Sequence, residues 1–211
     1  MLHGLWAGRW WRSAPTRRNL RETPQTIRDS VNEIDASVPL RAKRGEEHAF
    51  IEIVEFYYPR CLRFARNMLA NDQDAEEAVQ DAFVRVYDSF PRFREDGRFD
   101  PWLFRILANR CRTLLARSKR HRVLIEYGDV PATAAAAEED FGADWAEEVR
   151  VVLDSLPAEQ REAFLLRHVE DLSYEDIAAL TGVRLSALRM RVKRACDTLR
   201  ARLTEVEHHG R

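Results

Sequence analysis

The stretch LSYEDIAALTGVRLSALRMRVKRACDTL, residues 172–199, decides the fold of the C-terminal part of the chain. Ser173, with Asp176 three residues later, is a variant of the capping box that opens a helix, and Gly182 permits the tight turn that ends it. After the turn, apolar residues recur at the period of a second helix and share one face: Leu185, Leu188, Val192, Ala195, Cys196 and Leu199. Two helices joined by a tight turn form the helix-turn-helix pattern.

The second of these helices is cationic, since residues 182–195 hold five Lys or Arg and no acid. Lys and Arg neutralise phosphates and donate hydrogen bonds to base edges in the major groove, where helix-turn-helix proteins place this helix. The face opposite the apolar stripe presents Ser186, Ala187, Met190 and Arg194, with Arg191 and Lys193 at its flanks. Many cationic amphipathic helices are only solvated surface helices, but the turn and the spacing before this one favour binding of duplex DNA.

Helical patterns also fill the rest of the chain. Upstream of the first motif, the segments WAEEVRVVLDSL and PAEQREAFLLRHVE predict two helices, the second opened by Pro157 and Glu159. Nearer the N-terminus, residues 48–70 predict one helix that Pro59 kinks, or two helices that Pro59 separates. Residues 71–90 predict a helix capped by Asn71 or Asp72, and residues 101–122 predict a helix opened by Asp100 and Pro101.

The net charge of -1 hides an acidic segment between the two helical blocks. Residues 123–148 carry eight acids and no Lys or Arg, together with Gly, Pro and Ala and no apolar periodicity. Such a segment is either a solvated tether or an acidic strand that competes with nucleic acid for a basic groove. We therefore expect an all-α protein with two small helical domains, at 46–122 and 145–205. An acidic flexible linker at 123–144 joins them, and a poorly ordered extension occupies residues 1–45.

The segment between the predicted helices of the first block combines aromatic and basic residues. Seven Lys or Arg and no acid lie between Phe104 and Arg122, and five aromatic residues precede them at positions 90, 93, 99, 102 and 104. Single-stranded nucleic acid suits this combination, because bases stack on rings while cations follow the backbone. Most of the rings are expected to be core, with Phe93 and Phe99 the least certain because they bracket a loop. Asn109, a poor helix former in mid-helix, is either functional or simply solvent-facing.

Composition excludes several classes of protein. No apolar run reaches the ~18 residues of a membrane span, and the N-terminus lacks the apolar core of a signal peptide, so a cytoplasmic protein is expected. The three cysteines lack the spacing of a disulfide framework or a zinc site. An enzyme built on Glu76, Glu77 and Asp81 would need a His cluster or a phosphate-binding loop, and neither is found. No catalytic residue, metal or cofactor is predicted.

Two long segments resemble known sequences. Residues 74–120, DAEEAVQDAFVRVYDSFPRFREDGRFDPWLFRILANRCRTLLARSKR, resemble region 2 of the extracytoplasmic-function sigma factors in the sigma-70 family. Residues 156–203, LPAEQREAFLLRHVEDLSYEDIAALTGVRLSALRMRVKRACDTLRARL, resemble their region 4. The resemblance implies a bacterial transcription initiation factor that binds core RNA polymerase, recognises the -35 and -10 promoter elements and promotes DNA opening. It also implies an anti-sigma factor as a possible further partner.

The resemblance assigns roles to residues of each segment. It implies that the clamp helices of the largest polymerase subunit contact Asp74, Glu77, Gln80, Asp81 and Phe83. It implies that the -10 element, opened to single strands with one base flipped out, is contacted by Phe93, Arg94, Phe99, Arg105, Asn109 and Arg112. It implies that the -35 duplex is read by Arg184, Ser186, Ala187, Met190, Arg191, Lys193 and Arg194.

The second segment departs from the family pattern at several positions. Where many members read approximately GxPVGTVRSRLHRAR, this chain reads GVRLSALRMRVKRAC, so that Ala187 and Met190 replace two hydroxyl residues and Arg184 replaces a proline. The promoter preference is therefore expected to differ from that of the family. A conventional helix-turn-helix regulator remains the alternative, although it would leave the aromatic and basic segment without a role.

Overall fold

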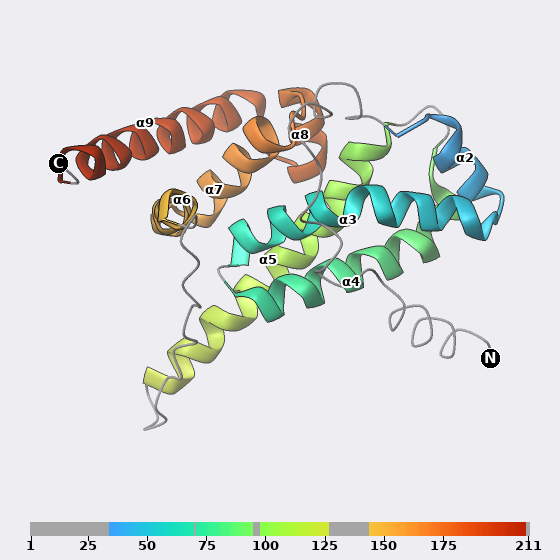
Figure 1. Ribbon diagram of the computed structural model, residues 1–211, viewed down its shortest axis with the longest axis horizontal. Helices are drawn as coiled ribbons and strands as arrows, with labels where there is room; N and C mark the ends of the chain where they lie inside the picture. Colours follow the sequence, from blue (N-terminus) through green and yellow to red (C-terminus); the bar gives the residue numbers. More distant parts are fainter. Residues whose placement is uncertain (1–33, 70, 95–97, 127–143, 210–211) are drawn as a thin grey trace. The chain divides into compact units, whose positions relative to one another are not determined.

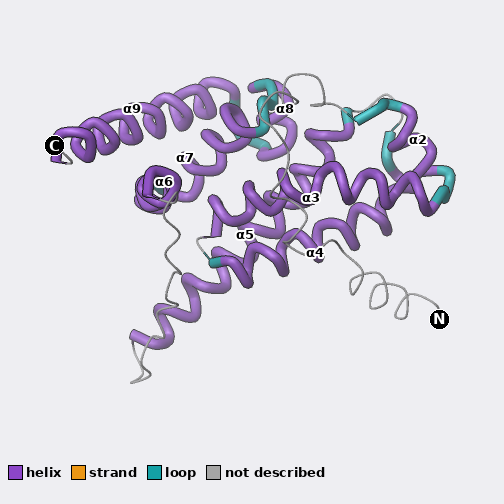
Figure 2. The backbone as a smooth tube through the Cα atoms, viewed as in Figure 1, coloured by secondary structure: helices purple, strands orange, loops and turns teal. Residues whose placement is uncertain are grey.

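The computed structural model of the chain describes residues 34–69, 71–94, 98–126 and 144–209. The helices in these ranges lie within the compact unit Ala36–Arg211, and the described residues contain no strand (Figures 1 and 2). The prediction of an all-α fold is confirmed. The predicted linker lies mainly in residues 127–143, outside the described residues, as does most of the predicted extension.

Four helices build the N-terminal block: α2 (Ser37–Lys43), α3 (Glu47–Leu69), α4 (Asp72–Ser89) and α5 (Phe99–Glu126). Each pair among α3, α4 and α5 is in contact, and α2 packs on α3 (Figure 1). The fully buried side chains between them include Tyr57, Phe64 and Phe104. Pro59 lies inside α3, which runs on as one helix, so the alternative of two separate helices is wrong.

The starts of α4 and α5 follow from local chemistry. Asn71 has extended backbone angles, and its side chain accepts a 2.9 Å hydrogen bond from the Asp74 amide, which confirms Asn71 as the cap of α4. Asp100 lies in the first turn of α5, where a carboxylate is favoured by the helix dipole. It also accepts a hydrogen bond from the Tyr57 hydroxyl and forms a 3.0 Å ion pair with Arg60, so that α3 fixes the start of α5.

The C-terminal block contains α6 (Asp144–Ser155), α7 (Ala158–Phe164), α8 (Tyr174–Thr181) and α9 (Leu185–His209), which confirms the four predicted helices. The Asp176 amide donates to the Ser173 hydroxyl at 3.0 Å, and the same hydroxyl lies 2.7 Å from the Asp176 carboxylate. Gly182 ends α8 with a φ of +72°, a conformation that costs glycine nothing. The predicted helix-turn-helix is therefore present, with the expected residues at its cap and its turn.

A π-helical turn, η5 (Leu165–Val169), follows α7 and was not predicted. The Glu170 amide donates to the Leu165 carbonyl and the Leu172 amide to the Leu166 carbonyl, each at 3.0 Å. Asp171 then adopts a φ of +58°, which is uncommon for a residue with a Cβ atom. This irregular turn directs the side chain of Glu170 into the interior, where it is fully buried.

Candidate nucleic-acid and polymerase interfaces

The start of α9 presents the surface predicted to read duplex DNA. Leu188, Val192, Ala195 and Leu199 are buried, which confirms most of the predicted apolar stripe, while Leu185 at its edge is partly exposed and Cys196 is half-buried. The opposite face is exposed at Arg184, Ser186, Ala187, Met190, Lys193 and Arg194, and Arg191 is half-buried. The geometry thus leaves cationic side chains accessible along the first three turns of the helix.

Aromatic and ionic contacts hold the flanks of this surface. The guanidinium groups of Arg167 and Arg189 lie 5.5 and 5.7 Å from the centroid of the Tyr174 ring, so these cations stack on the first helix of the motif. Lys193 forms a 2.7 Å ion pair with Asp197 one turn further along α9. Both partners are exposed, and such a pair exchanges readily for a phosphate contact.

The face of α5 predicted to contact single-stranded DNA is partly open. Arg105, Asn109 and Arg112 follow one another at helical spacing, and the first two are exposed. Arg112 is half-buried, and its Nε lies 3.3 Å from the Glu162 carboxylate of α7. Arg112 therefore forms an ion pair within the protein, whereas Arg105 and Asn109 face solvent.

Phe93 and Phe99 lie in the core, with exposures of only 4% and 7%. Their ring centroids are 5.7 Å apart, and the 3-10 turn η4 (Phe90–Arg92) adds Phe90, at 6.1 Å from Phe93 and 5.9 Å from Phe99. Trp102, which is half-buried, contacts all three rings. Neither Phe93 nor Phe99 presents a free face to a base in this structure. Both rings pack against Phe90 and Trp102, and their expected contact with the -10 strand stays a prediction.

The residues of α4 that were predicted to contact the polymerase differ in their surroundings. Glu77 and Asp81 each lie 2.7 Å from Nη2 of Arg110, so both join α4 to α5. Phe83 is buried and stacks against Tyr58 at 6.5 Å. These three residues have partners inside the bundle, but only Phe83 is buried, whereas the side chains of Glu77 and Asp81 are 46% and 43% exposed. Asp74 and Gln80 remain partly exposed.

A second exposed feature of α4 was missed by sequence reasoning. Val84 and Tyr87 are 52% and 46% exposed, although both are large apolar side chains. Val84 follows Gln80 by four residues and Tyr87 follows Val84 by three, so the three share one helix face. The sequence held one sign of this feature: Val84 is an apolar residue outside the apolar stripe of the helix. We call Gln80, Val84 and Tyr87 the α4 face.

Buried charged groups connect the helices of the two blocks. The fully buried Glu170 carboxylate lies 3.2 Å from Nε of Arg60 and 3.5 Å from Nη2 of Arg63, both on α3. Burial raises the pKa of Glu170, and the two arginines oppose that rise. Arg161 of α7 donates at 3.1 Å to the Met68 carbonyl and pairs with Asp154 at 2.7 Å.

The described residues show neither a metal centre nor a membrane span. No group of three or more His, Cys, Asp or Glu side chains within the described ranges could hold a metal ion. Among the helices that the structure describes, none is both long enough and apolar enough to cross a bilayer.

Both helical blocks match a known protein family. The family described as Sigma-70 region 2 matches residues 53–121, and Sigma-70, region 4 matches residues 146–199. RNA polymerase sigma factor CarQ of Myxococcus xanthus is 32% identical over 167 residues, which cover 79% of this chain and 96% of CarQ. The chain belongs to the extracytoplasmic-function sigma factors of the sigma-70 family.

Two further relatives extend the comparison of this sigma factor. The ECF RNA polymerase sigma factor SigE of Mycolicibacterium smegmatis is 36% identical over 157 residues, which cover 71% of this chain but only 59% of SigE. The solved structure of RpoE in complex with the anti-sigma factor NepR from Bartonella quintana has a TM-score of 0.63 at 27% identity. The match covers 74% of this chain and 96% of RpoE.

Family membership places the described surfaces of this sigma factor. The α9 surface and the helix-turn-helix lie in region 4, and the aromatic cluster, the exposed residues of α5 and the α4 face lie in region 2. Helix α2 lies before the start of the region 2 match. It falls inside the segment expected to be a poorly ordered extension, yet Val38, Pro39 and Ala42 of this helix are buried, so the described part of that segment is structured.

Proposed function

We propose that this chain is a transcription initiation factor that binds core RNA polymerase, reads the -35 and -10 elements of a promoter and promotes strand separation. The observation that carries the proposal is the presence, in one sigma-family chain, of two separate cationic helix surfaces. One suits duplex DNA and the other adjoins an aromatic cluster. A factor that only bound duplex DNA would need the first surface alone.

Reading of the -35 duplex is assigned to the start of α9. Arg194, on the face opposite the buried stripe, and Arg191, at its flank, are the leading candidates for contacts to bases or phosphates. Arg184, Ser186 and Lys193 surround them, and the exposed Ala187 and Met190 supply apolar contacts of the kind that suit a thymine methyl group. Because Ala187 and Met190 lack hydroxyl groups, the preferred -35 sequence is expected to depend on arginine contacts.

Capture of the opened -10 strand is assigned to α5 and the loop before it. Arg94, Arg105 and Asn109 are exposed and supply cationic and amide groups, while Phe93 and Phe99 are buried beside them. Extruding a base costs a few kcal/mol of stacking, which these contacts must repay. Arg112 would join them once its ion pair with Glu162 opens. The chemistry of RNA synthesis belongs to the polymerase, and we expect neither catalysis nor a cofactor in this chain.

Docking on the largest polymerase subunit is assigned to the α4 face together with Asp74. An exposed Val and Tyr beside a polar rim match the composition of protein interfaces, which combine apolar anchors with polar surroundings. Glu77 and Asp81 pair with Arg110 and are also partly exposed, so they remain candidates for direct contact with the polymerase. An anti-sigma factor is a further proposed partner, since RpoE of Bartonella quintana was solved with one.

Run-off transcription tests the proposed function. Purified bacterial core polymerase and a pooled genomic promoter library are incubated with the full chain, and new transcripts are mapped. We expect starts that share one pair of -35 and -10 sequences. The double substitution Arg191→Ala and Arg194→Ala should abolish them, whereas Arg202→Ala, an exposed arginine further along α9, should not. A chain that shifts duplex DNA but neither binds core polymerase nor directs initiation would be a conventional regulator instead.

A further inference from the structure

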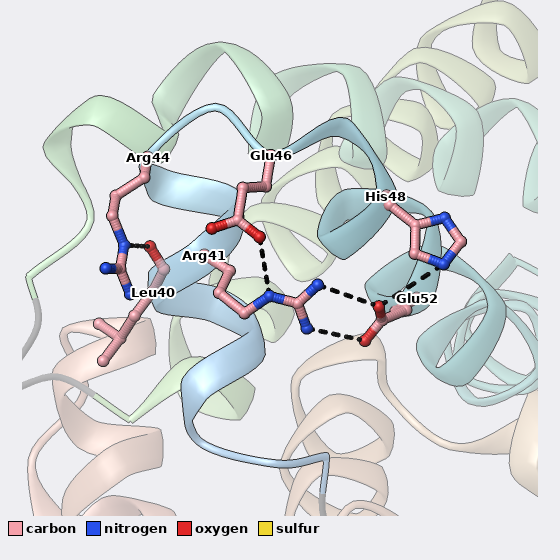
Figure 3. A network of polar contacts seen from close by, with 6 residues as sticks. All are labelled: Leu40, Arg41, Arg44, Glu46, His48 and Glu52. Carbon is pink, nitrogen blue, oxygen red and sulfur yellow. Dashed lines mark hydrogen bonds and ion pairs between the residues drawn. The ribbon is translucent and has the colours of Figure 1, made fainter.

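Arg41 of α2 forms ion pairs with the turn after α2 and with α3 (Figure 3). Nε of Arg41 lies 2.8 Å from the Glu46 carboxylate, and its two Nη atoms lie 3.4 and 3.5 Å from the Glu52 carboxylate. The Glu46 amide also donates to the Arg41 carbonyl at 3.2 Å across the intervening turn. One side chain thus connects α2, the turn and the second turn of α3.

The same part of α3 begins a chain of aromatic contacts. Phe50, between Glu46 and Glu52 in sequence, is buried, and its ring lies 5.9 Å from that of Phe90 in the 3-10 turn η4. Phe90 in turn contacts the rings of Phe93, Phe99 and Trp102. Helix α2 also touches η4 directly. Helix α2 therefore reaches the aromatic cluster directly, through η4, and also through the start of α3, which carries both Glu52 and Phe50.

The contacts of Arg41 suit a positioning role better than a role in overall stability. Arg41, Glu46 and Glu52 are each partly exposed, and ion pairs of this kind contribute little to the free energy of unfolding. Their geometric effect is larger, because Arg is held from two sides by carboxylates on a turn and on a neighbouring helix. Val38 and Ala42 add buried apolar contacts that orient the same helix.

We propose that α2, through Arg41 and Val38, positions η4, Phe93 and the start of α5 for capture of the opened -10 strand. The inference rests on the proposed function and adds a positioning element that lies before the region 2 match. Arg41 would act through Phe50 and Phe90, without touching DNA itself. Loss of α2 contacts should therefore loosen η4 and Phe93 while leaving α9 unchanged. The Phe50 ring also lies 5.1 Å from the ring of Tyr87 in the α4 face, so core binding is measured beside -10 binding.

The test compares Arg41→Ala with the conservative Arg41→Lys and with Val38→Asp, which places a carboxylate in the buried contact of α2. Arg66→Ala is the matched control, since Arg66 forms a 3.1 Å ion pair with Asp72 at the opposite end of α3. The first readout needs no DNA: amide hydrogen exchange in the full-length chain, followed at Phe93, whose amide donates to the Phe90 carbonyl at 2.9 Å. The second is the affinity of the holoenzyme for a single-stranded -10 oligonucleotide whose sequence is taken from the run-off transcripts.

Arg41→Ala should speed exchange at Phe93 and weaken binding of the oligonucleotide about two- to fivefold, with Arg41→Lys in between and Val38→Asp more severe. Affinity for core polymerase should fall less than affinity for the oligonucleotide, and Arg66→Ala should leave both readouts as in the wild type. Equal exchange at Phe93 in Arg41→Ala and Arg66→Ala would overturn the inference, as would a loss of core binding as large as the loss of oligonucleotide binding. Failure of the wild-type chain to bind core polymerase would instead overturn the proposed function, while the exchange data would still judge α2.

Discussion

Replacing Val84 by Ala should weaken binding of core RNA polymerase about fivefold. Val84 is 52% exposed in the described chain, so about half of its side chain remains to be buried when α4 docks. Full burial of a Val side chain is worth about 1.5–3 kcal/mol, and half of that burial is worth roughly 1 kcal/mol. A change of about 1.4 kcal/mol alters an equilibrium constant tenfold, so roughly 1 kcal/mol gives about fivefold.

The assay is a titration of labelled core polymerase with wild-type and variant chains. Val151→Ala is the matched control, because Val151 is 60% exposed on α6 and lies outside the α4 face. Both substitutions remove the same atoms from exposed sites, so thermal unfolding of the two variants should match that of the wild type. Val84→Asp, which adds a charge to the same site, should weaken binding further than Val84→Ala.

Two results would refute the reasoning. Unchanged affinity in both Val84→Ala and Val84→Asp would show that the α4 face is not the docking surface. An equal loss of affinity in Val84→Ala and Val151→Ala would show that the effect does not come from the α4 face in particular. In either case the exposed apolar residues of α4 would need another partner.

Three further predictions concern the helix-turn-helix and the buried charges. Gly182→Ala should lower the free energy of unfolding by about 1 kcal/mol, because alanine is strained at a φ of +72°. Urea unfolding measures this change, and an unchanged midpoint would contradict the turn geometry. Arg194→Ala should weaken binding of the -35 duplex and reduce the salt dependence of that binding by about one phosphate contact. Titrations at several salt concentrations measure both effects, and an unchanged salt slope would show that Arg194 does not contact a phosphate. Burial raises the pKa of Glu170 in the folded state above its pKa in the unfolded chain, so the folded state binds the proton more tightly. The free energy of unfolding should therefore rise as the pH falls through the raised pKa toward the ordinary value. Glu170→Gln should make that rise smaller in urea unfolding compared at pH 7 and pH 5, and an identical pH dependence in variant and wild type would exclude Glu170 as its source.

Local signals in the sequence predicted most of the helices. Ser173, Gly182 and Asn71 act through hydrogen bonds and backbone angles within a few residues of themselves, so their roles could be inferred without knowing the fold. The apolar stripe of α9 is likewise a property of one helix. The π-helical turn at Leu165–Val169 and the positive φ of Asp171 were not predicted, because no local residue pattern marks them.

The candidate site shows the same division. The exposed cations of α9 and the exposed Asn109 lie where helical periodicity put them. The ion pairs of Glu77, Asp81 and Arg112 could not be predicted in this way. The partner that a charged side chain meets depends on which neighbouring helix packs beside it. Arg110 of α5 and Glu162 of α7 supply those partners from distant points in the chain.

The sequence by itself therefore determined the class of fold, the order of the helices, the helix-turn-helix and the resemblance to sigma factors. It could do so because caps, turns and apolar periods are interactions between residues close together in the chain. Only the tertiary structure decided that Phe93 and Phe99 are buried, that α2 is linked to the aromatic cluster through Phe50, and that Glu170 meets Arg60 and Arg63. Each of these contacts joins residues far apart in sequence, and packing between helices, which no local pattern encodes, brings them together.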